Sequence, residues 1–353
     1  MNTEMTLKKR VQTFWAWFSA HRRQLERALA AHDAERAAAM VGKQLEEIDL
    51  PILCEAGNAD GRYMLSMSPC GDKNRQFACK YWAQLAPRFK NWDIRPFRRP
   101  ETLRTADLPG LFQRQCNPES FVVYCQTDEE EQRYHVHVVS EELAAFGGGR
   151  VAMCRMMFYL LLGEAHTDVY IGKIRCSAKV PDPVPKGTKM TLTEFCTMVR
   201  ETPSQKPWPC LLDPTSLCFG YQNEENGGDG MREDIFGGFT RNTRLLNEPG
   251  NESAEMMRMG GVYCYLYYEP KQKVPPVAAM EQAELTGKLE QLLDQYKLGC
   301  IVGSAQGSDY CYIDLMIADE PEFRAVFRDL SRMLGVQLYL EYFGRTPSGE
   351  YMQ

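Results

Sequence analysis

The sequence predicts an α+β protein, and three observations support this fold class. A long amphipathic helix opens the chain, and two later segments each have the order strand–strand–helix–strand. Near the C-terminus, aliphatic and aromatic residues alternate as expected for a sheet with helices on one side. The chain has 353 residues, 44% hydrophobic and 25% charged, which is enough apolar material for two or three domains.

Residues 7–30 predict a long helix, because their apolar side chains recur with the 3.6-residue period of one helical face. These side chains are Val11, Phe14, Trp15, Phe18, Leu25 and Leu29. Asp33 is a suitable N-cap for a second helix that ends near Leu45. We interpret residues 1–47 as an N-terminal helical cap on the next domain.

Residues 48–176 predict an α+β domain of two β-β-α-β units. The first unit has strands at 51–55, 62–68 and 91–97, with a helix at 72–85. The second has strands at 120–126, 133–140 and 168–175, with a helix at 151–162. We expect the two units to build one sheet with its helices on one side.

Residues 177–258 differ in composition from the segments on either side. Six prolines interrupt the first part, at positions 181, 183, 185, 203, 207 and 209. Residues 223–253 are rich in Asn, Glu and Gly. This composition predicts a linker and long loop with little regular structure, apart from a short helix at 192–200.

Residues 259–353 have the clearest pattern. Strands are predicted at 261–268, 299–304, 309–317 and 336–343, and helices at 277–296 and from Asp319 to Leu334. Asp319 is a suitable cap for the second helix, with Pro321 in its first turn. The order β-α-β-β-α-β is that of a ferredoxin-like domain.

Aromatic residues occupy one parity of these strands, and aliphatic residues occupy the other. The aromatic set is Tyr263, Tyr265, Tyr267, Tyr310, Tyr312, Tyr339 and Phe343. Since side chains alternate across a strand, we expect helices on the aliphatic face and a binding surface on the tyrosine face. RNA is disfavoured there, because residues 259–353 contain 8 Lys and Arg against 13 Asp and Glu. A small-molecule pocket is an alternative, and contact with protein, either the N-terminal domain or a second copy, is the favoured interpretation.

His135 and His137 lie two positions apart on a predicted strand and therefore share a face. With His166, and with Glu164 and Asp168 nearby in the sequence, they are candidate ligands of a divalent metal ion. The simpler interpretation is a solvated polar face of an antiparallel strand. No serine or cysteine lies in a recognisable nucleophile motif.

Composition restricts the classes of partner and compartment. A formal net charge of −6 disfavours nucleic acid and anionic membrane surfaces as partners. The 13 cysteines are scattered without a C-x-x-C motif, as is typical of a reducing compartment. No signal peptide and no apolar run of membrane-spanning length is visible, so we expect a cytoplasmic protein.

A set of residues in the N-terminal half resembles a widespread group of uncharacterised bacterial proteins. The set is Trp15-Ala16-Trp17-Phe18, Leu25, Leu53, Glu55-Ala56-Gly57, Leu65-Ser66, Leu85-Ala86-Pro87, Trp92, Phe97-Arg98-Arg99, Leu162-Gly163-Glu164 and Tyr170-Ile171-Gly172. The resemblance implies no particular activity, cofactor or substrate.

Taken together, the sequence favours a non-catalytic binding or regulatory module that acts through protein contacts or self-association. One alternative is a metal-dependent hydrolase that uses the three histidines. Another is a small-molecule sensor with a pocket between its domains.

Overall fold

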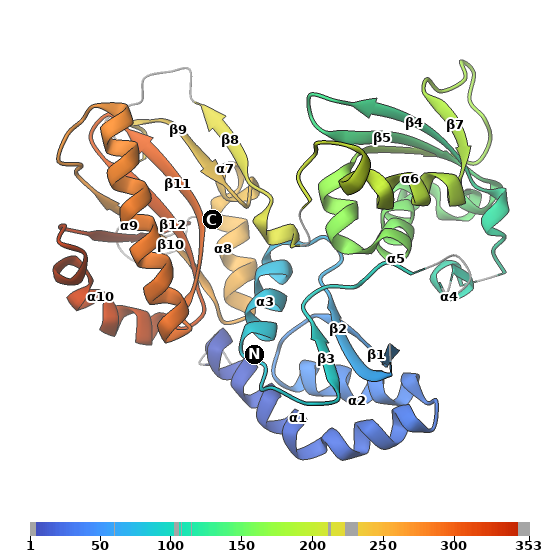
Figure 1. Ribbon diagram of the computed structural model, residues 1–353, viewed down its shortest axis with the longest axis horizontal. Helices are drawn as coiled ribbons and strands as arrows, with labels where there is room; N and C mark the ends of the chain where they lie inside the picture. The colour runs from blue at the N-terminus through green and yellow to red at the C-terminus, as the bar shows by residue number, and fades with distance from the viewer. Residues whose placement is uncertain are drawn as a thin grey trace. The chain divides into compact units, whose positions relative to one another are not determined.

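The computed structural model describes residues 5–59, 61–101, 106, 108–113, 115–210, 213–222 and 232–344. Helices and several separate sheets make this an α+β protein, as predicted (Figure 1). The chain forms two compact units. The first contains Met1–Leu65, Lys73–Ile94 and Cys218–Gln353, and the second contains Ser66–Asp72 and Arg95–Leu217. Within the described residues, no helix has both the length and the apolar character required to cross a bilayer.

The N-terminal helices form close to their predicted positions. The elements are α1 (Leu7–Ala30), α2 (Ala34–Glu47), β1 (Leu53–Ala59), β2 (Arg62–Ser68), α3 (Lys73–Gln84) and β3 (Trp92–Arg95). Asp33 caps α2 by accepting the backbone N–H of Arg36. The three strands form a sheet in the order β1-β2-β3. Trp15 of α1 stacks on Trp82 of α3 with ring centroids 4.6 Å apart, so aromatic packing joins these two helices.

The second unit is a four-stranded sheet with helices on one face. Its elements are α4 (Leu108–Phe112), η1 (Pro118–Ser120), β4 (Val122–Asp128), β5 (Arg133–Val139), η2 (Glu141–Gly149), α5 (Arg150–Tyr170), β6 (Ile171–Ser177), β7 (Thr188–Thr191), α6 (Leu192–Gln205) and η3 (Pro214–Ser216). The strand order is β6-β5-β4-β7. Helices α5 and α6 cover one face of this sheet (Figure 1). On that face Val123, Val136 and Val138 belong to the same hydrophobic core as Phe158 of α5 and Phe195 of α6.

Both predicted β-β-α-β segments are present, but the expectation that they share a sheet is wrong. β1, β2 and β3 form one sheet, and β4, β5 and β6 belong to another that also includes β7. Periodicity assigns each strand a buried face, but it carries no information about which strands pair.

The first unit also contains a six-stranded sheet. Its elements are β8 (Phe219–Gln222), β9 (Ile235–Thr240), α7 (Arg244–Asn247), α8 (Pro249–Arg258), β10 (Val262–Tyr268), α9 (Pro275–Tyr296), β11 (Gly299–Gly307), β12 (Cys311–Ile317), α10 (Glu320–Leu334) and β13 (Tyr339–Tyr342). The strand order is β13-β10-β12-β11-β9-β8. Each pair of neighbouring strands in this sheet is antiparallel.

The prediction of little regular structure over residues 177–258 is wrong. The segment contains β7, α6, β8, β9, α7 and α8, while residues 211–212 and 223–231 lie outside the described residues. The glycines of β9 resemble turn residues in the sequence but serve close strand pairing. A Cβ added to Gly238 would lie only 2.4 Å from the carbonyl oxygen of Ser304 on β11.

Period-two patterning correctly sorted the side chains of β10, β12 and β13. Leu266, Ile313 and Leu315 are fully buried against α9 and α10, where Leu289 and Phe323 belong to the same core. The tyrosine rings gather on the opposite parity, in a continuous series of ring contacts. This alternation therefore predicted both faces of the sheet.

Candidate functional site

The face of the β6-β5-β4-β7 sheet opposite α5 and α6 carries polar side chains in rows across the strands. Strand register aligns, from β7 to β6, the residues Lys189, Tyr124, His137 and Arg175. The next row pairs Gln126 with His135. Two positions apart on one strand, His135 and His137 share this face, as predicted. The register thus places imidazoles and cations from different strands side by side.

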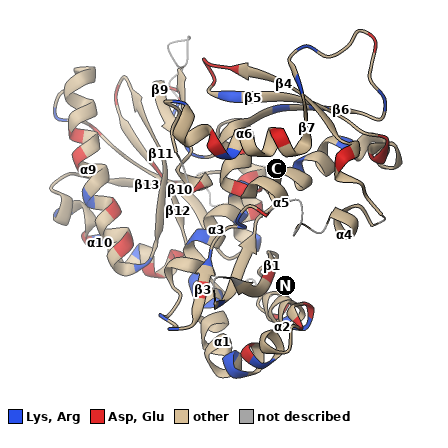
Figure 2. Cartoon of the chain, turned by 45° about the vertical axis from the view of Figure 1, so that its right-hand side comes forward, with Lys and Arg blue, Asp and Glu red and all other residues tan. Residues whose placement is uncertain are grey.

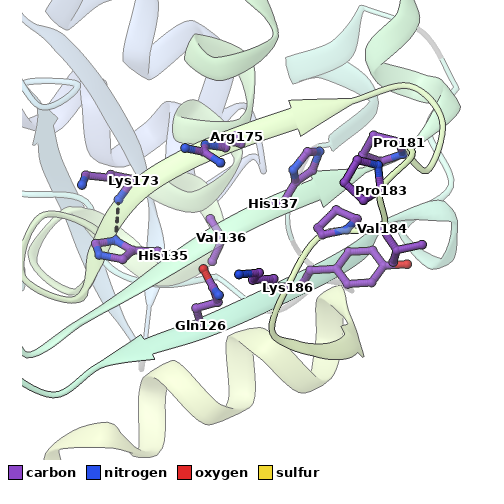
Figure 3. A pocket seen from close by; sticks show the side chains of 12 residues that line it. Gln126, His135, Val136, His137, Lys173, Arg175, Pro181, Pro183, Val184 and Lys186 are labelled. Atoms are coloured by element: carbon purple, nitrogen blue, oxygen red, sulfur yellow. Dashed lines mark hydrogen bonds between the residues drawn. The ribbon is translucent and has the colours of Figure 1, made fainter.

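A groove of about 600 Å³ lies on this face. Its second wall is the segment of residues 178–187 between β6 and β7, which we call the strap. The lining residues are Tyr124, Gln126, His135, Val136, His137, Lys173, Arg175, Pro181, Pro183, Val184, Pro185 and Lys186 (Figure 3). The sheet floor and the proline-rich strap therefore enclose polar and apolar groups in one cavity.

In the part of the chain that the structure describes, the groove is lined by cations and by no carboxylate. Three of its lining residues are Lys173, Arg175 and Lys186, and none is Asp or Glu. These three side chains are exposed, and in the described part of the chain none of them forms an ion pair. Unneutralised positive charges that converge on a cavity are suited to an anionic ligand.

His137 lies between the strands that carry these cations. Its Nε2 lies 2.9 Å from the hydroxyl oxygen of Ser177, which fixes the orientation of the ring. Burial lowers the pKa of His137 below its ordinary value, and the positive charge of Arg175 lowers it further. His137 therefore favours its neutral form, in which the ring can exchange a hydrogen bond without adding charge.

His135 has a defined tautomer in this arrangement. Its Nδ1 accepts the backbone N–H of Lys173 at 3.0 Å (Figure 3), so the neutral ring carries its proton on Nε2. That Nε2 lies 3.4 Å from Asp128 Oδ2 and 3.6 Å from Glu131 Oε2. In Figure 2 the turn between β4 and β5 is coloured red for its acidic residues. The acidic turn is therefore adjacent to one end of the groove.

Among the described residues, the three histidines predicted as metal ligands do not come together in one group. Within the described residues, the group of possible ligands that comes together consists of Asp128, Glu131 and His135. If His135 bound a metal through Nε2, its proton would have to move to Nδ1, where it would oppose the N–H of Lys173. His166 lies elsewhere on α5, with Nδ1 3.1 Å from the carbonyl oxygen of Leu162.

Glu164 and Asp168, the other suggested ligands, have separate partners. Glu164 is fully buried, and its Oε1 accepts the Ser68 hydroxyl at 2.8 Å and the Cys70 backbone N–H at 3.2 Å. Burial raises its pKa to about 8, against the favourable effect of these hydrogen bonds. Asp168 accepts the hydroxyl of Tyr159 at 2.8 Å.

A break in α5 positions Glu164. Gly163 has φ 74° and ψ 166°, a conformation that L side chains rarely adopt, so the helix kinks there. The backbone N–H of Glu164 consequently leaves the helical pattern and donates to the carbonyl oxygen of Arg98 at 3.3 Å. A Cβ at position 163 would lie 2.9 Å from the Pro100 ring, which also requires glycine.

Most of the predicted tyrosine surface is buried within its own unit. Tyr263 is 1% exposed, and its hydroxyl donates to Asn74 of α3 at 2.6 Å. Asn74 in turn donates to the buried Glu252 of α8 at 3.0 Å. Tyr265 and Tyr312 are also buried. The predicted binding surface is therefore not open as a whole, because helices α3 and α8 supply polar partners to it.

Arg232 covers the centre of the tyrosine face. Its guanidinium lies 4.8 Å from the Tyr265 ring centroid, 5.2 Å from that of Tyr312 and 5.0 Å from that of Phe343. Two hydrogen bonds, of 2.6 Å and 3.3 Å, join it to the carboxylate of Asp314. The aromatic rings at the centre of this face thus contact a cation of their own chain.

A smaller part of the aromatic set remains accessible. Tyr339 is 46% exposed and stacks on Tyr267 with ring centroids 5.0 Å apart. Tyr310 meets Tyr267 edge-on at 5.4 Å, and both of these side chains are half-buried. We call Tyr267, Tyr310 and Tyr339 the tyrosine rim.

Sequence reasoning found the histidines of the groove but missed its cations. Lys173 and Arg175 alternate on β6 as the histidines do on β5, and that parity was a usable signal. Lys186 gave no such signal, since it lies in the segment interpreted as a linker. Comparisons with protein-family models, with curated proteins and with solved structures found no match to this chain.

Proposed function

We propose that this chain is a non-catalytic binding protein whose groove on the second sheet holds an anionic ligand. The observation that carries the proposal is the convergence of Lys173, Arg175 and Lys186, none of them ion-paired among the described residues, on a cavity without a lining carboxylate. A bound anion would relieve the mutual repulsion of these cations and accept hydrogen bonds from them. His137 supplies a further polar group on the same floor.

Inorganic phosphate is the first probe of this proposal. We expect Arg175→Gln and Lys186→Gln each to weaken phosphate binding about ten- to hundredfold, because one charge-assisted hydrogen bond contributes about 1.5–3 kcal/mol. Calorimetric titration at fixed low ionic strength measures the dissociation constants, since salt screens exposed charges.

The matched control is Lys179→Gln, which removes an exposed strap lysine that does not line the groove. This control is expected to bind like the wild type. Equal losses in the control and the groove variants would indicate nonspecific electrostatics, and unchanged binding in all variants would reject the groove as the site.

The protein-contact role predicted from the sequence remains a second proposal, now restricted to the tyrosine rim. The exposed, stacked ring of Tyr339 favours it, because tyrosines combine apolar area with a hydroxyl at interfaces. For a second copy as partner, Tyr339→Arg should weaken self-association at least tenfold in sedimentation velocity. Tyr296→Arg, at a 38% exposed position of α9, is the control. A wild-type chain that stays monomeric at high concentration would exclude self-association.

We also infer that β10, α9, β11, β12, α10 and β13 form a ferredoxin-like module extended by β9 and β8. Support comes from the strand order β13-β10-β12-β11 and the antiparallel pairings within it. A cytoplasmic location is proposed from the thirteen cysteines, which are all free thiols.

A further inference from the structure

The two ends of the groove differ in chemistry. Lys173, His135 and Gln126 lie toward one end, and Pro181, Pro183 and Val184 lie toward the other, where the strap crosses the sheet (Figure 3). Arg175 and His137 occupy the floor in between. A ligand that fills the groove therefore meets positive charge at one part and apolar surface at another.

The groove is too large to be filled by a small inorganic ion. A volume of about 600 Å³ falls within the range of about 300–1,000 Å³ typical of sites for organic ligands. Val184 lines it with 60% of its surface exposed. An apolar body that covers Val184 would remove this surface from water.

We propose that the groove binds a small organic anion, with its charged head between Arg175, Lys173 and Lys186 and its apolar body against Val184 and the strap prolines. This inference rests on the proposed anion-binding function and adds the class of ligand. The head meets donors from β6 and the strap, while the body lies over the apolar wall.

A long polyanion fits the surroundings less well. Asp128 and Glu131 lie beside His135 at one end of the groove, so a nucleic-acid strand extending past that end would meet negative charge. A compact ligand with one charged head avoids this repulsion.

Phenyl phosphate and inorganic phosphate are matched probes for the inference. They share the head group, and only the former has an apolar body. We expect phenyl phosphate to bind the wild-type full-length chain at least tenfold more tightly than phosphate in calorimetric titrations at the same ionic strength. Val184→Ser should lose most of this preference and leave the dissociation constant of phosphate unchanged. The control, Val180→Ser, alters a strap valine that is 52% exposed and outside the lining, and it should keep the preference.

The possible outcomes distinguish the organic-anion inference from the anion-binding function on which it rests. Equal affinity for the two probes, with phosphate binding lost in Arg175→Gln, would overturn the organic-anion inference and leave the anion-binding function in place. Absence of binding to either probe would overturn both. Tighter binding of a single-stranded oligonucleotide than of phenyl phosphate would also overturn the inference in favour of a polyanion.

Discussion

Replacing Arg232 with Met is expected to destabilise the first unit by about 3–5 kcal/mol, the usual cost of removing one partner from a buried ion pair. The cost arises because Asp314, 2% exposed, would keep a buried carboxylate without its bidentate partner. Contacts of the guanidinium with Tyr265, Tyr312 and Phe343 would be lost as well.

Urea unfolding followed by tryptophan fluorescence measures this effect, since Trp15, Trp17, Trp82 and Trp92 all belong to the first unit. Adding Asp314→Asn to the Arg232→Met variant should recover part of the loss, because the unpaired charge is then removed as well.

The control for this variant is Arg324→Met. Arg324 lies 5.1 Å from the Tyr342 ring centroid, but its side chain is half exposed. We expect Arg324→Met to lower the free energy of unfolding by less than about 1 kcal/mol. Similar losses at positions 232 and 324, or strict additivity of the Arg232 and Asp314 changes, would contradict a buried-charge origin.

Replacing Glu164 with Gln is expected to remove most of the pH dependence of the second unit's stability between about pH 5 and pH 9. Burial raises the folded-state pKa of Glu164 from 4.5 to about 8. Between pH 4.5 and about pH 8 the folded state holds a proton that the unfolded state has released. Stability is therefore highest below the unfolded pKa and falls as pH rises through about 8, by a total of about 5 kcal/mol.

Trp208 reports on the second unit, because it is the one of the five tryptophans in the sequence that belongs to this unit. Unfolding free energies of the wild type and Glu164→Gln should converge near pH 5 and diverge toward pH 9, with the variant the more stable. Gln keeps an acceptor for Ser68 and Cys70. The control is Glu201→Gln, at an exposed position of α6. Its unfolding free energy should change with pH as that of the wild type does. Parallel curves for Glu164→Gln would show that Glu164 does not titrate in this range.

Local pattern predicted much of the fold. Helix α1 follows from its apolar period, α2 and α10 follow from Asp33 and Asp319 as caps, and β10 follows from strict alternation. Which strands pair could not be predicted, because the hydrophobic period of a strand indicates only its buried face. β8 and β9 are short and glycine-containing. β9 becomes a strand because the edge of β11 supplies its hydrogen-bond partners, and β8 then pairs with β9.

The candidate site was only partly predictable for a similar reason. The shared face of His135 and His137 follows from period two, but Lys186 joins them only through the path of the strap. On the tyrosine face, alternation placed the rings correctly but did not reveal what covers them. Arg232 is 33 residues before Tyr265 in the sequence, and no local pattern links a lone arginine to three distant rings.

The first unit is assembled from three separated stretches of sequence, and this has a consequence during synthesis on the ribosome. The backbone N–H of Leu7 donates to the carbonyl oxygen of Gly260, and that of Lys8 donates to Ala318. The backbone N–H groups in the first turn of α1 therefore gain both of these acceptors only after more than three hundred further residues have been translated. Residues 95–217 emerge earlier as an almost continuous stretch, so the inserted unit is free to fold before the first unit is complete.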